Sequence, residues 1–600
     1  PQQAAAIPAA AMERASMTIR PLRTTAFTLL LLSGAACGTA NAGGPLPCGV
    51  AAGDTTQTST VLWARASVAG EVTFEYSADP GFGSIAGSGV VQVADPLVPA
   101  KLDVGGLNAG VRYYYRATDA ANNSSIGQLT TPAAVGTRAG FRMGVSGDWR
   151  GELAPYPAVR NVAAKNLDLW VSNGDTIYAD YPSPDVPAPQ AQTLDEYRRK
   201  HNEVYSARLG MNTLSDLRSS TSTLVMIDDH EVTNDFAGGA SPASDPRFAG
   251  SPGNYINETA QYNNALQAVH EFNPIREQRF GATGDARTAG KLDLSRTRSY
   301  GSDAAVFTVD ARSFRDAELP AANPLSPASV GGFLVQSFNP SRTMLGRAQV
   351  DQLKADLSTA QADGTTWKFV MLPEPIQNLG VLGASDRYEG YAAERAEILR
   401  HIDVNNIENV VFVSADIHGT LVNNLTYQNG PGQAQIPTGA FEITTGSVGF
   451  DAPFGPTVAG LAYGLGVPGS LDPAIYASLP TVQQEAYIQA IVNAQVTALG
   501  YDPLGLQGSE INATLLQGGY TVTNAFGWSE FLIDPLTQAL TVNTWGIPAY
   551  TQQQLLSNPD SILALQPRIL SSFVVTPVPA PAATLLALGC GVVMSVRRRR

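Results

Sequence analysis

Cysteine is scarce in this sequence, because only Cys37, Cys48 and Cys590 occur among its 600 residues. The first and the last lie in segments that we expect to be removed or embedded in a membrane, which leaves Cys48 alone. This count excludes a disulfide framework and a zinc site built from cysteine. The redox compartment therefore has to be inferred from other features.

Charge is also sparse, and the 52 acidic residues outnumber the 38 basic ones. Charged residues make up 15% of the chain, and the formal net charge is -14. An acidic chain does not attract nucleic acid through its overall field, so we expect no specific nucleic-acid binding. A site for an anionic ligand must create its own positive potential, which bound metal ions can supply. Only five histidines are available for such a site.

Residues 17–42 have the pattern of a secretory signal peptide. Two arginines precede the apolar run 26–32, and Ala40-Asn41-Ala42 provides a small-x-small cleavage site. We therefore expect export, with a mature chain that begins near Gly43. A core helix is one alternative. Cys37 raises a lipoprotein alternative, although the residues before it lack the large aliphatic side chain expected ahead of a lipidated cysteine.

Length and composition indicate more than one domain. A chain of 600 residues with 44% hydrophobic residues, 57 glycines and 40 prolines is globular and turn-rich, and it is too long for one ordinary core. Residues 43–137 alternate between apolar and polar in short runs such as Val72–Tyr76 and Arg112–Arg116. This alternation predicts an N-terminal β-sandwich, which we interpret as a non-catalytic domain.

From about residue 138 to 550, strands alternate with helical stretches, which predicts an α/β domain built on a central sheet. The helical stretches include Pro157–Lys165 and Gly346–Ala360. Residues 452–516 form a Gly/Pro-rich insertion with a helix near Thr481–Leu499. Because this insertion lacks clusters of titratable residues, we expect it either to cover the functional site or to pack as a simple appendage.

Four apolar strands of this domain end in titratable residues. Leu167–Val171 leads to Asp175 and Tyr178, Leu224–Ile227 to Asp228-Asp229-His230-Glu231, Val410–Ala415 to Asp416-Ile417-His418, and Phe141–Ser146 to Gly147-Asp148. Ligands bind at the carboxyl ends of strands in open α/β sheets. One such end alone also suits a solvated surface turn. Four together predict a polynuclear metal site, because clustered like charges require a cation.

Two neighbouring metal positions account for these residues, with Asp175 as a carboxylate shared between them. A phenolate, an imidazole and a carboxylate suit a hard ion such as ferric iron. An all-oxygen set suits calcium, magnesium or manganese, with zinc as a further alternative. The candidate ligands are Tyr178, His418 and Asp148 for the iron position, and Asp229 and Asp416 for the second position.

A pair of cations indicates phosphate chemistry, because two metals can bind a phosphoryl group and lower the pKa of a bridging water. His230 is adjacent to Asp229 and is a candidate to protonate the leaving group or to contact the phosphate. Arg312 and Arg315 follow the strand Ala305–Asp310 and are candidates to clamp phosphate oxygens. An ion pair with a carboxylate is an equal alternative for each arginine.

These motifs, in this order, resemble the alkaline phosphatase D (PhoD-like) metallophosphatase family over about residues 48–450. The matching stretches are Gly49–Asp54, Leu62–Arg65, Gly174–Tyr178, Asp228–Val232, Asp310–Arg315, Leu345–Gln349, Gly390–Arg395 and Asp416–His418. The resemblance implies a fibronectin- or Ig-like N-terminal domain, a calcineurin-like α/β phosphoesterase domain with a central mixed β-sandwich, and a site that holds iron and calcium. The Gly-Asp-x-x-Tyr spacing is also similar to purple acid phosphatases, in which the tyrosine binds ferric iron.

One position departs from the family pattern. The family usually has a metal-binding cysteine at the end of the first strand of this domain, where Ser146-Gly147-Asp148 stands here. We predict that Asp148 replaces it, because a carboxylate suits ferric iron and resists oxidation. Arg150 would then lie close enough to contact a substrate phosphate. The alternative is a simple turn at Asp148, with only calcium bound or an inactive domain.

The C-terminal residues 551–600 end in the pattern of a sorting signal. Val578-Pro579-Ala580-Pro581 precedes an apolar stretch at 582–596 and four arginines at 597–600. This tail is similar to PEP-CTERM signals, except that Ala580 replaces the usual glutamate. The similarity implies an exosortase-type sorting machinery as a partner and a transient membrane association. The apolar stretch is shorter than the about 20 residues that cross a bilayer comfortably.

Together these patterns predict an exported enzyme, in the periplasm, at the cell surface or outside the cell, that hydrolyses small phosphate esters. Monoester and diester substrates are not distinguished, because the shape of the pocket beyond the metals decides between them. A surface-displayed binding or matrix protein with a degenerate phosphatase domain is the alternative, and the missing cysteine and the sorting tail both allow it.

Overall fold

The computed structural model describes residues 44–450 and 452–579. The predicted signal peptide at 17–42 and the apolar stretch and arginines of the predicted sorting signal lie outside these residues. In the part of the chain that is described, no helix is long and apolar enough to cross a membrane.

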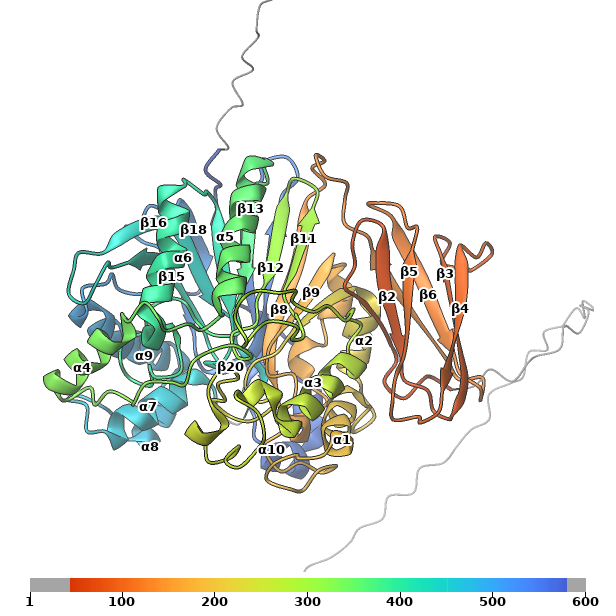
Figure 1. Cartoon of the computed structure of the whole chain (residues 1–600), viewed down its shortest axis with the longest axis horizontal. Helices are drawn as coiled ribbons and strands as arrows, with labels where there is room; N and C mark the ends of the chain where they lie inside the picture. Colours follow the sequence, from red (N-terminus) through yellow and green to blue (C-terminus); the bar gives the residue numbers. More distant parts are fainter. Residues whose placement is uncertain (1–43, 451, 580–600) are drawn as a thin grey trace, which may run out of the picture. The chain divides into compact units, whose positions relative to one another are not determined.

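The N-terminal region consists of β-structure in two packed layers (Figure 1). The first layer is a sheet in the order β4-β3-β6-β7, with β3 (Gly70–Ser77), β4 (Gly87–Val93), β6 (Arg112–Thr118) and β7 (Ser124–Thr130). The second layer contains β1 (Val50–Gly53), β2 (Ser59–Ala64) and β5 (Ala100–Gly105). Leu62, Phe74 and Tyr115 belong to the core that the layers share. The fibronectin or Ig type of this region stays a prediction.

The second layer continues beyond the N-terminal region into the sheet of the following region. β1 pairs in parallel with β10 (Ser222–Met226), so that β1, β2 and β5 continue an 11-stranded sheet of the following region. Its other strands are β8 (Phe141–Trp149), β9 (Leu169–Asn173), β17 (Ser447–Gly449), β18 (Ala513–Gln517), β20 (Ala525–Ile533), β21 (Leu540–Pro548) and β22 (Arg568–Val575). The order is β18-β22-β21-β20-β8-β9-β10-β1-β2-β5, with β17 paired to β8. This sheet therefore ends at Val575, beyond the boundary that we drew at residue 550.

A second sheet packs on the first and completes a sandwich. Its strands are β11 (Arg296–Tyr300), β12 (Ala304–Thr308), β13 (Trp367–Met371), β14 (Val410–Ser414), β15 (Thr420–Tyr427), β16 (Ile436–Thr444) and β19 (Thr521–Val522), in the order β11-β12-β13-β14-β16-β15-β19. Met143 and Val171 of the first sheet share a buried core with Phe369 and Val413 of the second. Both sheets contain parallel and antiparallel pairs. The predicted mixed β-sandwich is confirmed.

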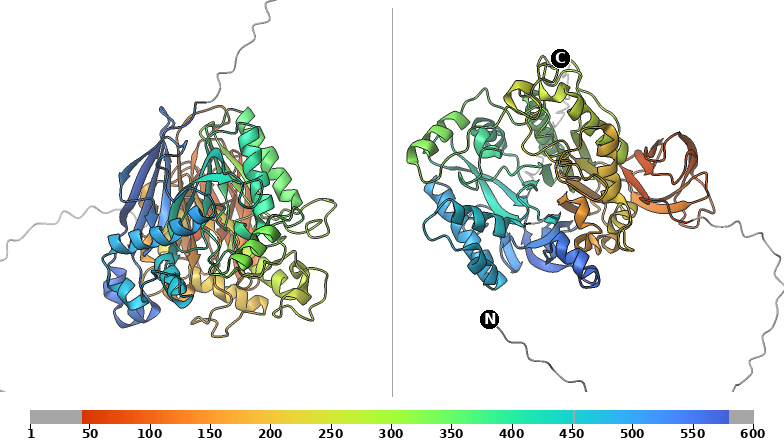
Figure 2. Two further views of the ribbon diagram at one scale, coloured as in Figure 1. Left: turned by 90° about the vertical axis from the view of Figure 1, so that its left-hand side faces the viewer. Right: turned by 90° about the horizontal axis from the view of Figure 1, so that it is seen from below.

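Helices cover the outer faces of the sandwich. α5 (Arg347–Ala362) and α6 (Ala392–Val404) pack on the second sheet, and Figure 2 shows them as an outer layer. α1 (Leu194–Tyr205), α2 (Thr213–Ser220) and α3 (Ala260–Phe272) share a core with the outer face of the first sheet. The remaining helices are α4 (Pro327–Ser337), α7 (Phe454–Gly464), α8 (Pro473–Ser478), α9 (Thr481–Ala498), α10 (Gln552–Ser557) and α11 (Pro559–Leu563).

Two of the three predicted helices form as expected. α5 and α9 coincide with the helical stretches near 346–360 and 481–499. The third stretch, Pro157–Lys165, is helical only in part, because it forms two short 3₁₀ helices, Pro157–Val159 and Val162–Lys165, instead of one continuous helix. A nine-residue segment has little helical stability of its own. Tertiary contacts decide its conformation, such as the 3.1 Å hydrogen bond from Trp528 Nε1 to the side chain of Asn161.

The insertion at 452–516 has its own small core. Helices α7 to α9 pack around Phe454, Val492 and Val496 together with Ile417, which precedes His418. The N–H of Phe454 also donates to the carbonyl of His418 at 3.0 Å. The insertion is therefore attached next to a predicted ligand, and its covering role stays a prediction.

Candidate metal centre

Four strand ends meet at one place in the sandwich. β8, β9 and β10 are parallel neighbours, and the amide of Asn173 donates across to the carbonyls of Leu372 and Val413 in the second sheet at 2.7 and 3.2 Å. The long apolar runs of these strands are buried on both faces, as is typical of parallel strands inside α/β proteins. Among the predicted ligands, each of the following is at most 2% exposed: Asp148, Asp175, Tyr178 and Asp229.

The predicted iron ligands gather in one group. His418 Nε2 lies 3.4 Å from Asp148 Oδ1 and 3.4 Å from Tyr178 Oη, and Tyr178 Oη lies 3.5 Å from Asp148 Oδ1. Asp148, Asp175 and His418 each offer an atom, and these atoms lie within 4.8 Å of one another. The structure thus brings together three strand ends that are far apart in the sequence.

Two further groups adjoin the first. Asp175, Asp229 and His230 offer atoms within 4.8 Å of one another, and so do Asp228, Glu374 and Asp416. Asp175 therefore belongs to two groups, as a carboxylate shared between two metals must. Asp416 is grouped with Asp228 and Glu374 rather than with Asp229. Sequence reasoning gave Glu374 no role, because it lies in a loop after β13 and not in a recognisable cluster.

The backbone is strained at the same positions. Asp148, Asp175, Asp416 and His418 have φ angles of 64°, 51°, 64° and 58°. Residues other than glycine rarely adopt this left-handed conformation, and such residues concentrate at functional sites. The strain is consistent with tertiary structure that fixes these side chains in position.

The electrostatics of the centre favour a cation. Burial, reinforced by neighbouring carboxylates, raises the pKa of Asp175 and Asp416 well above the usual value. Burial also raises the pKa of Asp228, to about 7, although Arg312 opposes the shift. The following buried carboxylate oxygens accept no hydrogen bond in the described part of the chain: Asp148 Oδ2, Asp228 Oδ2, Asp229 Oδ1 and Glu374 Oε2. Buried oxygens of this kind, close together, are suitable metal donors.

Glu231 organises the loops that carry the ligands. It is fully buried, and its carboxylate accepts hydrogen bonds from the N–H groups of Asp175 at 3.2 Å, Thr176 at 2.6 Å and Asp228 at 2.8 Å. One side chain therefore ties the end of β9 to the end of β10. Its position directly after His230 was the only sequence signal for this role.

His230 is held by a partner that the sequence did not reveal. Its Nδ1 lies 2.7 Å from Asp180 Oδ1, and its Nε2 lies 3.9 Å from Asp229 Oδ1. Burial lowers the pKa of His230, but Asp229 and Asp180 outweigh burial and raise it to about 9. Asp180 follows Tyr178 by two residues, which was a weak signal for a contact with the other strand end.

Arg312 and Arg315 belong to a buried network of ion pairs with carboxylates of the centre and of the loop after β13. Both side chains are at most 1% exposed. Arg312 donates to the two oxygens of Asp386 at 2.8 Å each and forms further ion pairs with Asp228 and Glu374. Arg315 pairs with Glu374 at 3.2 Å. These contacts correspond to the ion-pair alternative for both arginines, and a direct phosphate contact stays a prediction.

Comparison with known proteins assigns the chain to a family. A family model described as PhoD-like phosphatase matches residues 145–483, and a second, described as PhoD-like phosphatase, N-terminal domain, matches residues 33–133. The chain belongs to the PhoD-like phosphatase family. It is therefore an enzyme, a metal-dependent phosphoesterase, and the alternative of an inactive binding protein loses its support.

The chain is also similar to individual proteins. Alkaline phosphatase D of Bacillus subtilis is 26% identical over 442 residues, which cover 68% of this chain and 70% of that protein. A solved structure of PhoD matches with a TM-score of 0.64 at 20% identity, over 92% of this chain and 95% of that chain. The purple acid phosphatase PPD1 from yellow lupin (Lupinus luteus) seeds has a TM-score of 0.45 at 9% identity, over 88% and 73% of the respective chains.

The donor set of this PhoD-like phosphatase fits metal binding without cysteine. Asp148 supplies a buried carboxylate at the end of β8, within reach of Tyr178 and His418. The described chain has one free cysteine, Cys48, which contacts Asn202 and Ser206 of the α1 region instead. Carboxylate, phenol and imidazole groups are thus the donors present at this edge of the sheet.

Arg150 lies at the rim of the same site. It is 8% exposed, forms an ion pair with the buried Glu152, and its guanidinium lies 4.3 Å from the ring centre of Tyr181 and 5.3 Å from that of Phe450. Phe450 stacks on His418 with ring centres 3.8 Å apart. Sequence reasoning missed Phe450 because it carries no titratable group and follows a three-residue strand.

Proposed function

We propose that this PhoD-like phosphatase is an exported enzyme that hydrolyses phosphate monoesters, diesters or both by attack of a metal-activated water. Iron would be held by Asp148, Asp175, Tyr178 and His418. Calcium, or magnesium, manganese or zinc in its place, would be held by Asp175, Asp229 and Asp416. When bound, such a pair of cations would bind phosphoryl oxygens and lower the pKa of the attacking water.

The position of Asp175 is the observation that carries this proposal. Its carboxylate takes part in the group with Asp148 and His418 and in the group with Asp229 and His230. Two cations that share one carboxylate lie a few ångströms apart, which is the spacing that suits transfer of a phosphoryl group. The burial of the centre strengthens every electrostatic interaction with a developing negative charge.

The residues around the centre supply the remaining chemistry. Hydrolysis forms a bond between the water oxygen and phosphorus and breaks the bond to the leaving oxygen, which then needs a proton. Because Asp180 occupies Nδ1 of His230, Nε2 is the atom that can give this proton. Arg150, which lies near two aromatic rings at the rim, would contact a phosphate oxygen.

Hydrolysis of two chromogenic esters on one preparation tests the proposal. We expect p-nitrophenyl phosphate, bis(p-nitrophenyl) phosphate or both to be cleaved, and a chelator to abolish cleavage until iron and calcium are returned. Asp175→Asn should lose activity and bound metal together, whereas the exposed Asp195→Asn on α1 should lose neither. Full metal content and full activity in Asp175→Asn would refute the shared carboxylate.

Export and sorting form a separate part of the proposal, motivated by the two terminal segments. We expect material from cells to begin near Gly43, to lack residues 597–600 and to associate transiently with the membrane through an exosortase-type machinery. Mass spectrometry of the intact protein measures both ends. An intact N-terminus would refute the signal peptide, and intact C-terminal arginines would refute the sorting signal.

A further inference from the structure

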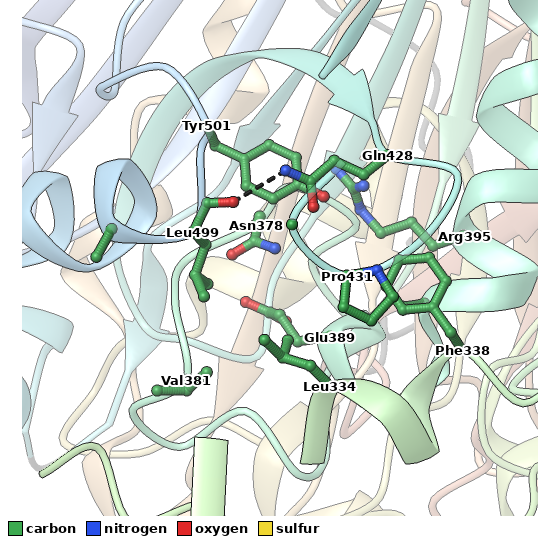
Figure 3. Close-up of a pocket in the computed structure, with 13 residues that line it drawn as sticks. Leu334, Phe338, Asn378, Val381, Glu389, Arg395, Gln428, Pro431, Leu499 and Tyr501 are labelled. Atoms are coloured by element: carbon green, nitrogen blue, oxygen red, sulfur yellow. Dashed lines mark hydrogen bonds between the residues drawn. The ribbon is translucent and has the colours of Figure 1, made fainter. Parts of the chain in front are cut away.

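A pocket outside the metal centre opens between α4, the start of α6, the loop after β15 and the end of α9 (Figure 3). Its volume is about 130 Å³, close to the ~150 Å³ of an engineered protein cavity that binds benzene. Leu334, Phe338, Val381 and Leu499 give it apolar walls. The pocket can therefore hold an apolar body of about one ring.

One buried cation lines this pocket. Arg395 is 4% exposed, and its hydrogen bonds go to the carbonyls of Ile376 at 2.6 Å and Thr426 at 2.9 Å. Its guanidinium also lies 5.6 Å from the ring centre of Tyr501. Within residues 44–450 and 452–579, no carboxylate forms an ion pair with Arg395. A buried charge without a counter-ion is costly, so an anion in the pocket would relieve that cost.

The nearest carboxylates have other partners. Glu389 lines the pocket, but it accepts hydrogen bonds from Arg387 at 3.3 Å and from the N–H of Leu379 at 2.7 Å. Glu442 accepts hydrogen bonds from two backbone N–H groups and a serine, and burial raises its pKa to about 7. Neither residue forms an ion pair with Arg395, although the guanidinium lies near enough to Glu442 to oppose the rise in the pKa of Glu442.

The cation and the apolar side chains lie on different sides of the pocket. Figure 3 shows Arg395, Gln428 and Tyr501 on one side of the hollow, with Leu334 and Val381 on the opposite side, where Glu389 also lies. A ligand with an anionic group at one end and an apolar body at the other matches this division. A single guanidinium suits one negative charge, whereas a doubly charged phosphate among apolar walls would remain poorly compensated.

The pocket and the metal centre share one loop. Residues 374–391 include Glu374 and Asp386, which form ion pairs with Arg312 next to the candidate metal ligands. The same loop supplies Val381 and Glu389 to the pocket. A ligand that fixes Val381 and Glu389 therefore restrains the segment that holds Asp386 in place.

We propose that this pocket is a second binding site, for a small monocarboxylate with an apolar body of about one ring, and that its occupancy changes turnover at the metal centre through the loop 374–391. The carboxylate pairs with Arg395, and the ring packs against Leu334 and Phe338. The binding half of this proposal does not depend on the proposed phosphatase mechanism, because binding is measured without turnover.

The test uses benzoate as the probe and the metal-loaded full chain as the protein. We expect saturable binding by calorimetry, weakened about tenfold or more by Leu334→Trp, whose indole fills the pocket. Val335→Trp is the matched control, because Val335 is the next residue of α4 and is 68% exposed. Benzyl alcohol, which lacks the charge, should bind about tenfold more weakly than benzoate, and inorganic phosphate should not compete.

Benzoate can also bind at the metal centre through its carboxylate. The same variants distinguish binding in this pocket from binding at the metal centre. Equal benzoate binding in the wild type and Leu334→Trp, or displacement by phosphate, would overturn the second site. Arg395→Met should remove the preference for benzoate over benzyl alcohol. Benzoate should change the kcat of ester hydrolysis in the wild type and in Val335→Trp but not in Leu334→Trp. Specific binding with an unchanged kcat would overturn the coupling through the loop.

Discussion

The Nδ1 atom of His230 lies 2.7 Å from Oδ1 of Asp180, and the other carboxylate oxygen of Asp180 accepts a hydrogen bond from the N–H of Asn234 at 2.7 Å. Asp180 is thus fixed on both sides. It determines which ring nitrogen of His230 faces the metal centre, because the second nitrogen is occupied.

Replacing Asp180 should therefore impair turnover more than binding. We expect Asp180→Asn to lower kcat about 10- to 100-fold with a small change in KM, because His230 loses its orientation but the metal carboxylates stay. Steady-state kinetics and metal analysis of the same sample measure both. The control is Asp185→Asn, an exposed carboxylate in the same loop region, which should leave kcat unchanged. Loss of metal in proportion to kcat would show that Asp180 supports the metal site instead.

The colour of the iron-loaded protein should report on Asp148 and Tyr178. A phenolate bound to ferric iron gives a visible absorption band, so we expect Tyr178→Phe to remove it and Asp148→Ala to bleach it. Oδ1 of Asp148 lies 3.5 Å from Oη of Tyr178 at the proposed iron position. Tyr181→Phe is the control, because the ring of Tyr181 lies edge-on to that of Tyr178, with ring centres 5.8 Å apart, without belonging to the ligand group. An unchanged spectrum and rate in Asp148→Ala would identify Asp148 as a simple turn residue.

Removal of Arg312 should destabilise the metal-free protein strongly. Asp228 would lose its buried counter-ion, while Glu374 and Asp386 would keep only Arg315, and the loss of a buried counter-ion costs about 3–5 kcal/mol. We expect this decrease in the free energy of unfolding for Arg312→Met by urea denaturation. Arg347→Met removes exposed ion pairs with Asp351 and Glu397, for which about 0–1 kcal/mol is expected. Equal effects in the two variants would contradict the importance of the buried network.

Lys368 should make stability depend on alkaline pH. Burial lowers its pKa to about 8, and its ammonium donates to Gln361 Oε1 at 2.6 Å and to the carbonyl of Glu408 at 3.0 Å. Below pH 8 the lysine is charged in both states, and the folded state carries the full burial cost. Between pH 8 and about 10.4 the folded protein has released this proton while the unfolded chain still holds it, so stability rises with pH.

Replacement by an apolar side chain removes this cost. We expect Lys368→Met to raise the free energy of unfolding by about 1–2 kcal/mol at pH 7. The gain should shrink toward pH 10, as measured by urea denaturation at both pH values. A gain that stays constant over this range would show that packing, rather than the buried charge, explains it.

Much of the central fold and most of the candidate ligands followed from local patterns in the sequence. The apolar runs before Asp148, Asp175, Asp229 and Asp416 form buried strands, because four or five consecutive apolar side chains are shielded from water on both faces only inside the sandwich. The parallel neighbours β8, β9 and β10 place their carboxyl ends at one edge, so Asp148, Asp175 and Asp229 lie close together. The sequence by itself therefore predicted which strand ends carry the candidate metal centre, and the packing of the second sheet brings Asp416 to it.

Tertiary structure alone decided which groups pair within that centre. Asp180, Glu374 and Asp386 lie in loops whose paths depend on the packing of both sheets, and no periodic pattern marks them. The same holds for Asp416, which is grouped with Asp228 and Glu374 and whose pKa the charge of Asp229 also raises. The packing of the whole core fixes which side chains meet over long sequence separations. The pattern of apolar and polar residues along the sequence indicates only which residues are buried and which strand end they follow.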